Sequence, residues 1–245
     1  MSHPITVLWS IPRSVSTSFE RMVSERGDHL VLDEPFSRAY YFGPDRRSDR
    51  YDRTIPHSSL REVVEEIEEA ARERPVFVKD MAYQAQDLLD GDFVGRVRNA
   101  FMVRHPAATL RSLARTWPDF TDDETGWAHL DRVADLVEDA GEPLVVVDAE
   151  ALCADPERVV ADFCDRLGLD HRPDALTWEP GMRPEWELWQ EWHGSTAGTT
   201  GFSPLRPPPP PPGDDQHRLR AAYEAAMPVY ERLLAHAVRG ASKDK

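Results

Sequence analysis

The chain has 245 residues, of which 40% are hydrophobic and 30% charged, enough to bury the core of one large domain without help from disulfides or metal ions. Its formal net charge of -15 at pH 7 repels nucleic acid and anionic membranes at long range. Any anion site must therefore be built from a few placed Arg, Lys and backbone N–H groups.

Short apolar runs alternate with amphipathic segments along the chain. The continuous apolar runs predict strands at 5–9, 30–32, 76–78, 100–103 and 144–147. Helical spacing and start signals predict helices at 16–26, after the capping box of Ser59 and Glu62, after Pro106, and from about 216 to 238. Apolar strands separated by helices are typical of a parallel sheet covered on both faces. We therefore predict a single α/β domain over residues 1–239, with a P-loop-like parallel sheet flanked by helices.

A run of six prolines, 207–212, lies in a connector at 206–213 before the last predicted helix. Such a run forms a stiff polyproline II segment. It could be a ligand for a proline-binding module, but a surface loop that leads to the last helix is the better interpretation. Pro228 should bend that helix, and we expect residues 240–245 to be a frayed tail.

The loop after the first strand gathers anion-binding groups. Arg13 is accompanied by four hydroxyl-bearing residues where the first helix begins, namely Ser14, Ser16, Thr17 and Ser18. Helix N-terminal N–H groups and the helix dipole favour an anion at this place in an α/β fold. The loop is no Walker A motif, because the required glycines and lysine are absent. A Ser/Thr-rich helix cap is the alternative, but a cap needs one hydroxyl, so we predict an anion site.

A second polar pair follows the strand at 100–103. Arg104 stands at the carboxyl end of this strand, which is the usual ligand-binding edge of a parallel sheet, and Ser112 lies eight residues later in the next helix. The two side chains can flank a second phosphate on the same edge. A surface Arg and a solvent-facing Ser are the alternative, which this pair alone does not exclude.

Four segments in order resemble the sulfotransferases that use 3′-phosphoadenosine 5′-phosphosulfate (PAPS), in a divergent bacterial or fungal-type branch. Residues 12–17, Pro-Arg-Ser-Val-Ser-Thr, are similar to the family's 5′-phosphosulfate loop, P-[KR]-S-[GS]-[ST]-T, and Arg104 with Ser112 has the spacing of its 3′-phosphate motif. Residues 146–156 are similar to its strand followed by E-x-L…D-P, and 163–169 to its F-L-G-L helix end.

The resemblance implies metal-independent, in-line transfer of a sulfuryl group from PAPS to a hydroxyl of a small molecule, with 3′,5′-adenosine bisphosphate (PAP) as product. It implies that Arg104 and Ser112 hold the 3′-phosphate. It assigns the 5′-phosphosulfate to the loop residues Arg13, Ser14, Ser16, Thr17 and Ser18. The histidines and carboxylates show no metal-ligand spacing, so we predict no metal site.

A hydroxyl acceptor requires a general base. Asp33 and Glu34 follow the second strand, and the resemblance to some bacterial members assigns the base to Glu34, with Asp33 as competitor and a loop carboxylate or helix cap as the alternative. Lys79 ends the third strand, where the animal branch has a Lys that contacts the bridging oxygen. A surface Lys or a partner of Asp80 is the alternative for it. The animal branch has a His base two residues after this Lys, where this chain has Met81. The base must therefore come from another residue, which favours Glu34, with His105 as the fallback.

The chain departs from the family pattern at three places. Val15 stands where many members have Gly, and Arg13 where many have Lys. The late G-x-x-G-x-x-K motif has no clear copy, and residues 193–202 occupy its region. We expect Ser195 and Thr196 to reach the 3′-phosphate or the adenine, and a flexible Gly/Thr loop is an equally good interpretation.

Aromatic and acidic residues suggest where an acceptor would bind. Three tryptophans spaced by three on a predicted helix could line a pocket with Trp117 and Trp178, although core packing is the better interpretation of any single one; the three are Trp186, Trp189 and Trp192. The acidic stretch 119–124 could recognise a cationic acceptor or form a solvated loop. Two other functions stay open: a nucleotide-dependent kinase or NTPase with a degenerate P-loop, and a non-catalytic nucleotide-binding protein.

The lack of a recognisable targeting signal and the small number of cysteines lead us to expect a cytoplasmic protein. No apolar run approaches the roughly 18 residues that span a bilayer, and the first residues lack the pattern of a signal peptide. Cys153 and Cys164 are too few for a disulfide framework or a zinc site, and we expect both to be reduced and buried. We expect a cytoplasmic protein without a nucleic-acid or membrane partner, and the sequence does not predict its oligomeric state.

Overall fold

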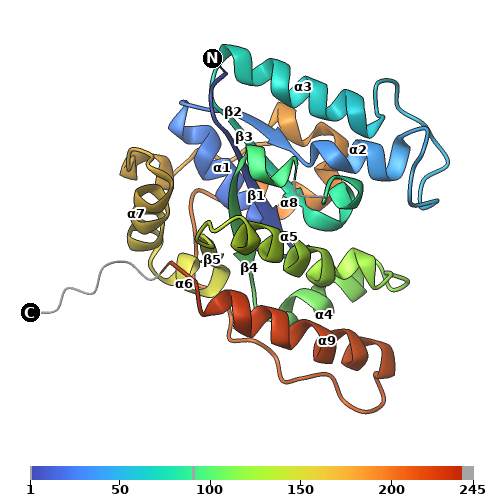
Figure 1. The fold of residues 1–245 in the computed structure, drawn as a ribbon. Coiled ribbons are helices and arrows are strands. Elements are labelled where there is room, and N and C mark those ends of the chain that lie inside the picture. Colours follow the sequence, from blue (N-terminus) through green and yellow to red (C-terminus); the bar gives the residue numbers. More distant parts are fainter. Residues whose placement is uncertain (1, 90–91, 239–245) are drawn as a thin grey trace, which may run out of the picture.

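The computed structural model describes residues 2–89 and 92–238, and its centre is one parallel sheet (Figure 1). Five strands pair in the order β2-β3-β1-β4-β5. Their bounds are Ile5–Ser10 (β1), Leu30–Asp33 (β2), Val76–Met81 (β3), Arg98–Val103 (β4) and Val146–Asp148 (β5). Every pairing is parallel. The predicted single-domain α/β fold with a parallel sheet is therefore confirmed.

Helices connect and cover the strands. The capping box is present, with Ser59 accepting from the backbone of Glu62, and it opens α3 as predicted. The α-helices are Ser16–Arg26 (α1), Pro35–Phe42 (α2), Leu60–Glu73 (α3), Pro106–Thr116 (α4), Trp127–Asp139 (α5), Ala149–Ala154 (α6), Pro156–Leu167 (α7), Gln190–Ala197 (α8) and His217–Leu234 (α9). Short 3₁₀ helices of three to seven residues join several of them.

Both faces of the sheet are buried, because successive side chains of a strand point to opposite sides. In β1, Val7 and Trp9 belong to the apolar cluster that includes α3, α5 and α9. Leu8 belongs to a second cluster on the other face, where Phe19 of α1 and Phe163 of α7 pack against each other with ring centroids 4.9 Å apart. The helices drawn on either side of the strands in Figure 1 form these two layers.

The strand order places a ligand-binding crevice. The connection after β1 leads to β2 on one side of the sheet, and the connection after β4 leads to β5 on the other side. The two connections therefore diverge between the neighbouring strands β1 and β4. Open α/β sheets bind ligands at the carboxyl ends of their strands where connections diverge in this way. The loops that follow β1 and β4 carry Arg13 and Arg104, so both predicted anion-binding arginines flank this point.

The proline connector is mostly exposed, in agreement with the surface-loop interpretation, and Arg111 Nη2 donates to the carbonyl of Pro210 at 2.9 Å. Helix α9 continues through Pro228 and packs on α4 and α5. The predicted frayed tail at 240–245 lies outside the described residues. Among residues 2–89 and 92–238, no helix combines the length and the apolar character needed to cross a membrane.

Candidate functional site

The loop between β1 and α1 wraps tightly around the start of the helix. Arg13 and Val15 have positive φ values of 67° and 73°, in the left-handed region that glycine adopts most easily. The hydroxyl of Ser14 donates to the carbonyl of Ile11 at 2.7 Å, and the amide of Ser18 to the carbonyl of Val15 at 3.0 Å. Val15, which stands where many members of the resembled family have Gly, therefore adopts this left-handed conformation under strain.

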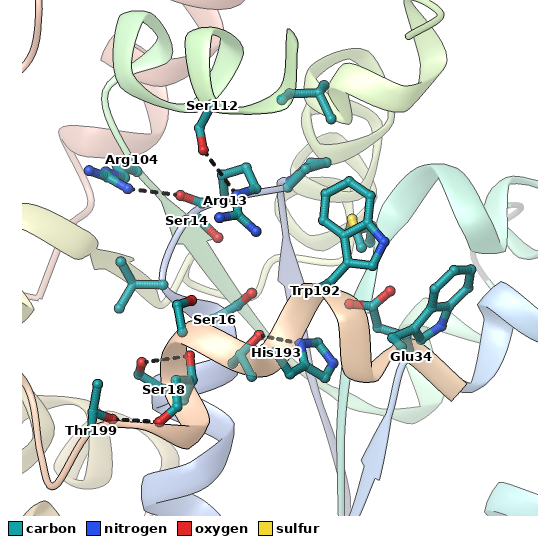
Figure 2. A pocket seen from close by; sticks show the side chains of 18 of the residues that line it. Arg13, Ser14, Ser16, Ser18, Glu34, Arg104, Ser112, Trp192, His193 and Thr199 are labelled. Atoms are coloured by element: carbon teal, nitrogen blue, oxygen red, sulfur yellow. Dashed lines mark hydrogen bonds between the residues drawn. The ribbon is translucent and has the colours of Figure 1, made fainter. Parts of the chain in front are cut away.

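A cavity of about 310 Å³ opens above this loop, within the range of small-molecule sites. Figure 2 shows its side chains. Among the residues predicted from the sequence, its lining includes Arg13, Ser14, Ser16, Thr17, Ser18, Glu34, Arg104, Ser112, Ser195 and Thr196. Lys79 is not part of this lining. Ten of the eleven predicted site residues thus surround one space, although they come from four distant parts of the chain.

The two predicted phosphate corners are in contact. Arg13 Nε donates to Ser112 Oγ at 3.0 Å, and Arg104 Nη1 donates to the backbone carbonyl of Arg13 at 3.1 Å (Figure 2). Burial, followed by the charges of Arg104 and Arg115, lowers the pKa of Arg13. In this structure the Arg13 side chain therefore lies with the pair predicted to hold the 3′-phosphate, and its positive charge adds to that of Arg104.

Arg104 has an acidic neighbour that motif reading did not select as a site residue. Glu150 Oε1 lies 3.6 Å from Arg104 Nε, and neither atom has a hydrogen-bond partner among the described residues. Burial, followed by the charge of Asp148, raises the pKa of Glu150 to about 7. The Arg104 guanidinium thus keeps an unsatisfied, buried donor beside the cavity, as expected of a group that binds an anion.

Glu34 and Lys79 meet behind the cavity. Glu34 is the residue before α2, with a left-handed φ of 46°, and its side chain lines the cavity. Lys79 Nζ lies 2.5 Å from Glu34 Oε1 and 2.6 Å from Asp33 Oδ1, and the Lys79 side chain is 1% exposed. Burial alone would lower the pKa of Lys79, but these carboxylates outweigh it and raise this pKa well above its usual value. Lys79 is therefore a buried cation that holds both carboxylates.

The competing base candidates are engaged elsewhere. The Asp33 side chain is fully buried, bonded to Lys79 and to His193. Burial would raise the pKa of Asp33, but the charge of Lys79 and the hydrogen bond of His193 lower it far below its usual value. His105 caps α4, where its Nδ1 accepts from the amide of Ala107, and it lies outside the cavity lining. Glu34 is the one of the three that lines the cavity.

His193 is a site residue that sequence reasoning missed. It lies in α8, is 2% exposed and lines the cavity. Its Nε2 lies 2.7 Å from Asp33 Oδ2, and its Nδ1 lies 3.3 Å from Thr17 Oγ1. The only signal in the sequence was its place at the start of the segment 193–202, which we selected for its hydroxyls and not for its imidazole.

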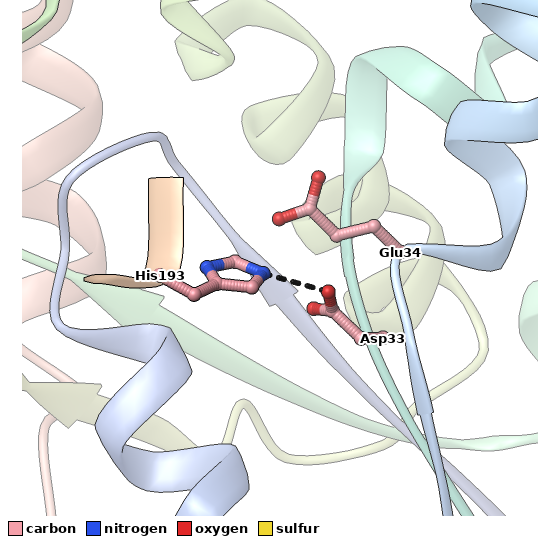
Figure 3. Close-up of side chains that lie close together, drawn as sticks. All are labelled: Asp33, Glu34 and His193. Atoms are coloured by element: carbon pink, nitrogen blue, oxygen red, sulfur yellow. Dashed lines mark hydrogen bonds and ion pairs between the residues drawn. The ribbon is translucent and has the colours of Figure 1, made fainter. Parts of the chain in front are cut away.

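Asp33, Glu34 and His193 form a compact cluster (Figure 3), with ligand atoms within 4.8 Å of one another, a spacing that could hold a metal ion. The Lys79 ammonium already bonds to both carboxylates at 2.5 and 2.6 Å. A cation would have to displace this buried charge, so we describe the cluster as an ion-pair network centred on Lys79.

The segment that replaces the late family motif is partly helical. Residues 193–197 belong to α8, so the interpretation as a flexible Gly/Thr loop holds for 198–202 at most. Thr196 Oγ1 lies 3.4 Å from Ser18 Oγ, which joins this helix to the β1–α1 loop. The prediction of one helix through three tryptophans was wrong: Trp186 and Trp189 lie in a 3₁₀ turn, Pro184–Trp189, and only Trp192 lies in α8.

The other end of the cavity is aromatic. Its walls include Tyr41, Tyr83, Trp117, Trp189 and Trp192, whereas Trp178 and Trp186 pack outside the lining. Two guanidinium groups lie over these rings, Arg13 at 5.7 Å from the centroid of Trp192 and Arg50 at 4.3 Å from that of Trp117.

Two carboxylates of the acidic stretch near this end, those of Asp119 and Glu124, are paired with an arginine, whereas Asp122 and Asp123 are exposed. Arg50 bonds to Glu124 at 2.7 Å and to Asp119 at 3.0 Å, and Glu124 is buried. These carboxylates therefore hold Arg50 in place rather than offering free negative charge to a cationic acceptor. Cys153 also lines the cavity, and burial raises the pKa of its thiol to about 11, which keeps it unreactive.

Proteins of known sequence and a solved structure are similar to this chain. Two proteins of Arabidopsis thaliana are similar to it: branched-chain-amino-acid aminotransferase-like protein 2 is 29% identical over 199 residues (80% of this chain, 35% of that protein), and branched-chain-amino-acid aminotransferase-like protein 1 is 28% identical over 240 residues (96% and 42%). The chain thus spans less than half the length of these relatives. Among solved structures, the sulfotransferase domain from the curacin biosynthetic pathway shares the fold, with a TM-score of 0.51 at 14% identity over 91% of this chain and 98% of that one.

A sequence model described as the sulfotransferase domain matches residues 5–237, from the first residue of β1 to just beyond α9. The match therefore includes every strand of the sheet and each loop that lines the cavity. On this evidence the chain belongs to the sulfotransferase domain family, as its four motifs predicted.

Proposed function

We propose that this protein transfers a sulfuryl group from PAPS to the hydroxyl of a small molecule. One observation supports the proposal most: Arg13, Arg104 and Glu34 follow three different strands and line the same cavity. The arginines supply the positive charge that the phosphates and the sulfonate of the donor require, and Glu34 supplies a carboxylate to the acceptor.

The donor would lie across the crevice between β1 and β4. The hydroxyls of Ser16, Thr17 and Ser18 and the first N–H groups of α1 would hold the 5′-phosphosulfate, whereas the Ser14 hydroxyl, which donates to the carbonyl of Ile11, would hold the loop in shape. Arg104 and Ser112 would hold the 3′-phosphate, with Arg13 between the two ends because its side chain already contacts Ser112. Ser195 and Thr196 line the same cavity and would complete the nucleotide site.

The transfer would break the bond between sulfur and the bridging phosphate oxygen and form one between sulfur and the acceptor oxygen, while the acceptor proton moves to Glu34. The direct contact of Lys79 with the bridging oxygen stays a prediction. The burial of Lys79 supports a positioning role, in which its ammonium holds Glu34 Oε1 at 2.5 Å. Glu34 Oε2, which lies 3.5 Å from the side-chain amide nitrogen of Gln84, would then face the acceptor.

The aromatic end supports an uncharged acceptor with a flat apolar body. Tyr41, Tyr83 and the tryptophans provide ring surface, and the guanidinium groups of Arg13 and Arg50 already lie over two of those rings. Arg50 is paired with Asp119 and Glu124, so it is the positive charge of Arg13 that opposes a cationic acceptor. We keep the cytoplasm as the proposed location.

Calorimetry with PAP and with ATP tests the donor assignment. A sulfotransferase should bind PAP in EDTA and prefer it to ATP with Mg²⁺. Preference for ATP with Mg²⁺ would favour a kinase or NTPase, and binding of neither would favour a non-catalytic protein.

Glu34→Gln tests the base. The variant should keep its affinity for PAP, because the change is isosteric and Glu34 bonds to neither arginine, and should lose about 10²-fold or more in turnover of labelled PAPS with a panel of phenols and alcohols. Turnover equal to that of the wild type would assign the base to another residue.

A further inference from the structure

A chain of hydrogen bonds connects the buried acidic cluster with the β1–α1 loop. Asp33 bonds to His193 Nε2 at 2.7 Å (Figure 3), and His193 Nδ1 lies 3.3 Å from Thr17 Oγ1. The ring of Trp186 packs against the imidazole with centroids 5.4 Å apart and holds it in place. Both His193 and Thr17 line the cavity.

The partners of His193 determine where its hydrogens lie. Asp33 is ionised, because the charge of Lys79 and the bond to His193 keep its pKa low despite burial. A carboxylate can only accept, so Nε2 carries a hydrogen. Nδ1 of a neutral imidazole is then an acceptor, and it takes the hydroxyl hydrogen of Thr17.

This arrangement conflicts with binding an anion. Thr17 has one hydroxyl hydrogen, and while it points at His193, only oxygen lone pairs of that hydroxyl face the cavity. The oxygens of a phosphate or sulfonate are acceptors and need a donor at this place. If Nδ1 also carries a hydrogen, it donates to Thr17 Oγ1, and the Thr17 hydroxyl becomes free to donate to the anion.

We propose that His193 takes up a proton when the nucleotide binds, and that the Thr17 hydroxyl, then free, donates its hydrogen to the 5′ end of that nucleotide. The inference rests on the proposed function. The proton comes from solvent, forms the Nδ1–H bond and is released when PAP leaves, so no other reactant is needed.

The charges around His193 support the proton uptake. The groups that face it or its partners are Asp33, Glu34, Lys79 and Glu20. Burial, followed by the charge of Asp33, raises the pKa of Glu20 well above its usual value, which favours the neutral form of Glu20. Two carboxylates against one ammonium leave one net negative charge, which an imidazolium cancels. On the cavity side, the described lining contributes the two arginines 13 and 104 against a multiply charged nucleotide.

Proton uptake can be measured directly. PAP is titrated into the full chain by calorimetry at about pH 7.5, where phosphate groups are largely ionised, in EDTA and in two buffers of different ionisation enthalpy. The buffer dependence of the heat should report about one proton taken up per PAP by the wild type, beyond what the variants take up. As the pH rises, the affinity of the wild type for PAP should therefore fall more steeply than that of the variants. The difference in slope should be up to about tenfold in affinity per pH unit.

Three variants separate the inference from a structural effect. Thr17→Val removes only the hydroxyl, and His193→Asn removes the ring; each should abolish the extra proton uptake. Thr17→Ser keeps the hydroxyl and should retain it. Equal uptake in the wild type and Thr17→Val, or no uptake by a wild type that binds PAP, would overturn the inference and leave the proposed function standing. A wild type that does not bind PAP would overturn both.

Discussion

Replacing Glu150 by Gln perturbs the electrostatics of the Arg104 corner without changing its shape. Glu150 lies 3.6 Å from the Arg104 guanidinium, and both of its oxygens are buried without a hydrogen-bond partner among the described residues. Burial, followed by the charge of Asp148, raises its pKa to about 7 from the ordinary value of 4.5. The folded state therefore binds the Glu150 proton more tightly than the unfolded state does.

The magnitude follows from this difference. About 2.5 in pKa corresponds to about 3 kcal/mol, at roughly 1.4 kcal/mol per pKa unit. The side chain is 26% exposed, and solvent screening reduces the figure to about 1–2 kcal/mol. Because the folded-state pKa is raised, this contribution is fully present below pH 4.5 and is lost as the pH rises through about 7.

The assay is urea unfolding at about pH 5 and pH 8. The advantage of Glu150→Gln over the wild type in free energy of unfolding should grow by about 1–2 kcal/mol between the two conditions. Glu157→Gln, an exposed position on α7, serves as the matched control and should show no such growth. A Glu150→Gln difference that is the same at both pH values would refute the reasoning.

Two further changes test the loop and the ion-pair network. Val15→Gly should be more stable than Val15→Ala by about 1 kcal/mol, because both lose the same packing and only glycine accepts a φ of 73° without strain; the reverse order in urea unfolding would disprove the strain. Lys79→Met should lower the free energy of unfolding by about 3–5 kcal/mol, because it leaves the Asp33 and Glu34 carboxylates buried without a counter-charge. Adding Asp33→Asn to Lys79→Met should recover part of that loss, and a double variant that is less stable than the single one would contradict the pairing.

Local sequence signals were sufficient to predict most of the fold. The helix at 16–26 has the observed bounds, and the Ser59–Glu62 capping box begins α3, because both depend on contacts between residues a few positions apart. Strand ends were predicted less well: β3 continues through Lys79 to Met81, where polar residues end the apolar run although the ladder with β1 goes on.

The candidate site was predictable where it follows strand ends and not where it depends on distant packing. Arg13 and Arg104 are identified by their places after strands, since parallel strands bring their carboxyl ends to one edge. The bond between His193 and Asp33 joins residues 160 positions apart through the packing of α8, and no local pattern encodes it. The burial of Lys79 was missed for the same reason, because its carboxylate partners come from β2, the loop after it and α1.

The central claim is that Arg104 and the β1–α1 loop bind opposite ends of one doubly phosphorylated adenosine. Calorimetry of Arg104→Ala with PAP and with AMP tests it most directly, because only PAP carries the 3′-phosphate, and Arg61→Ala on the exposed face of α3 is the control. The account predicts that Arg104→Ala loses at least about tenfold more affinity for PAP than for AMP, as expected for a charged hydrogen bond. Equal losses for the two nucleotides would contradict it.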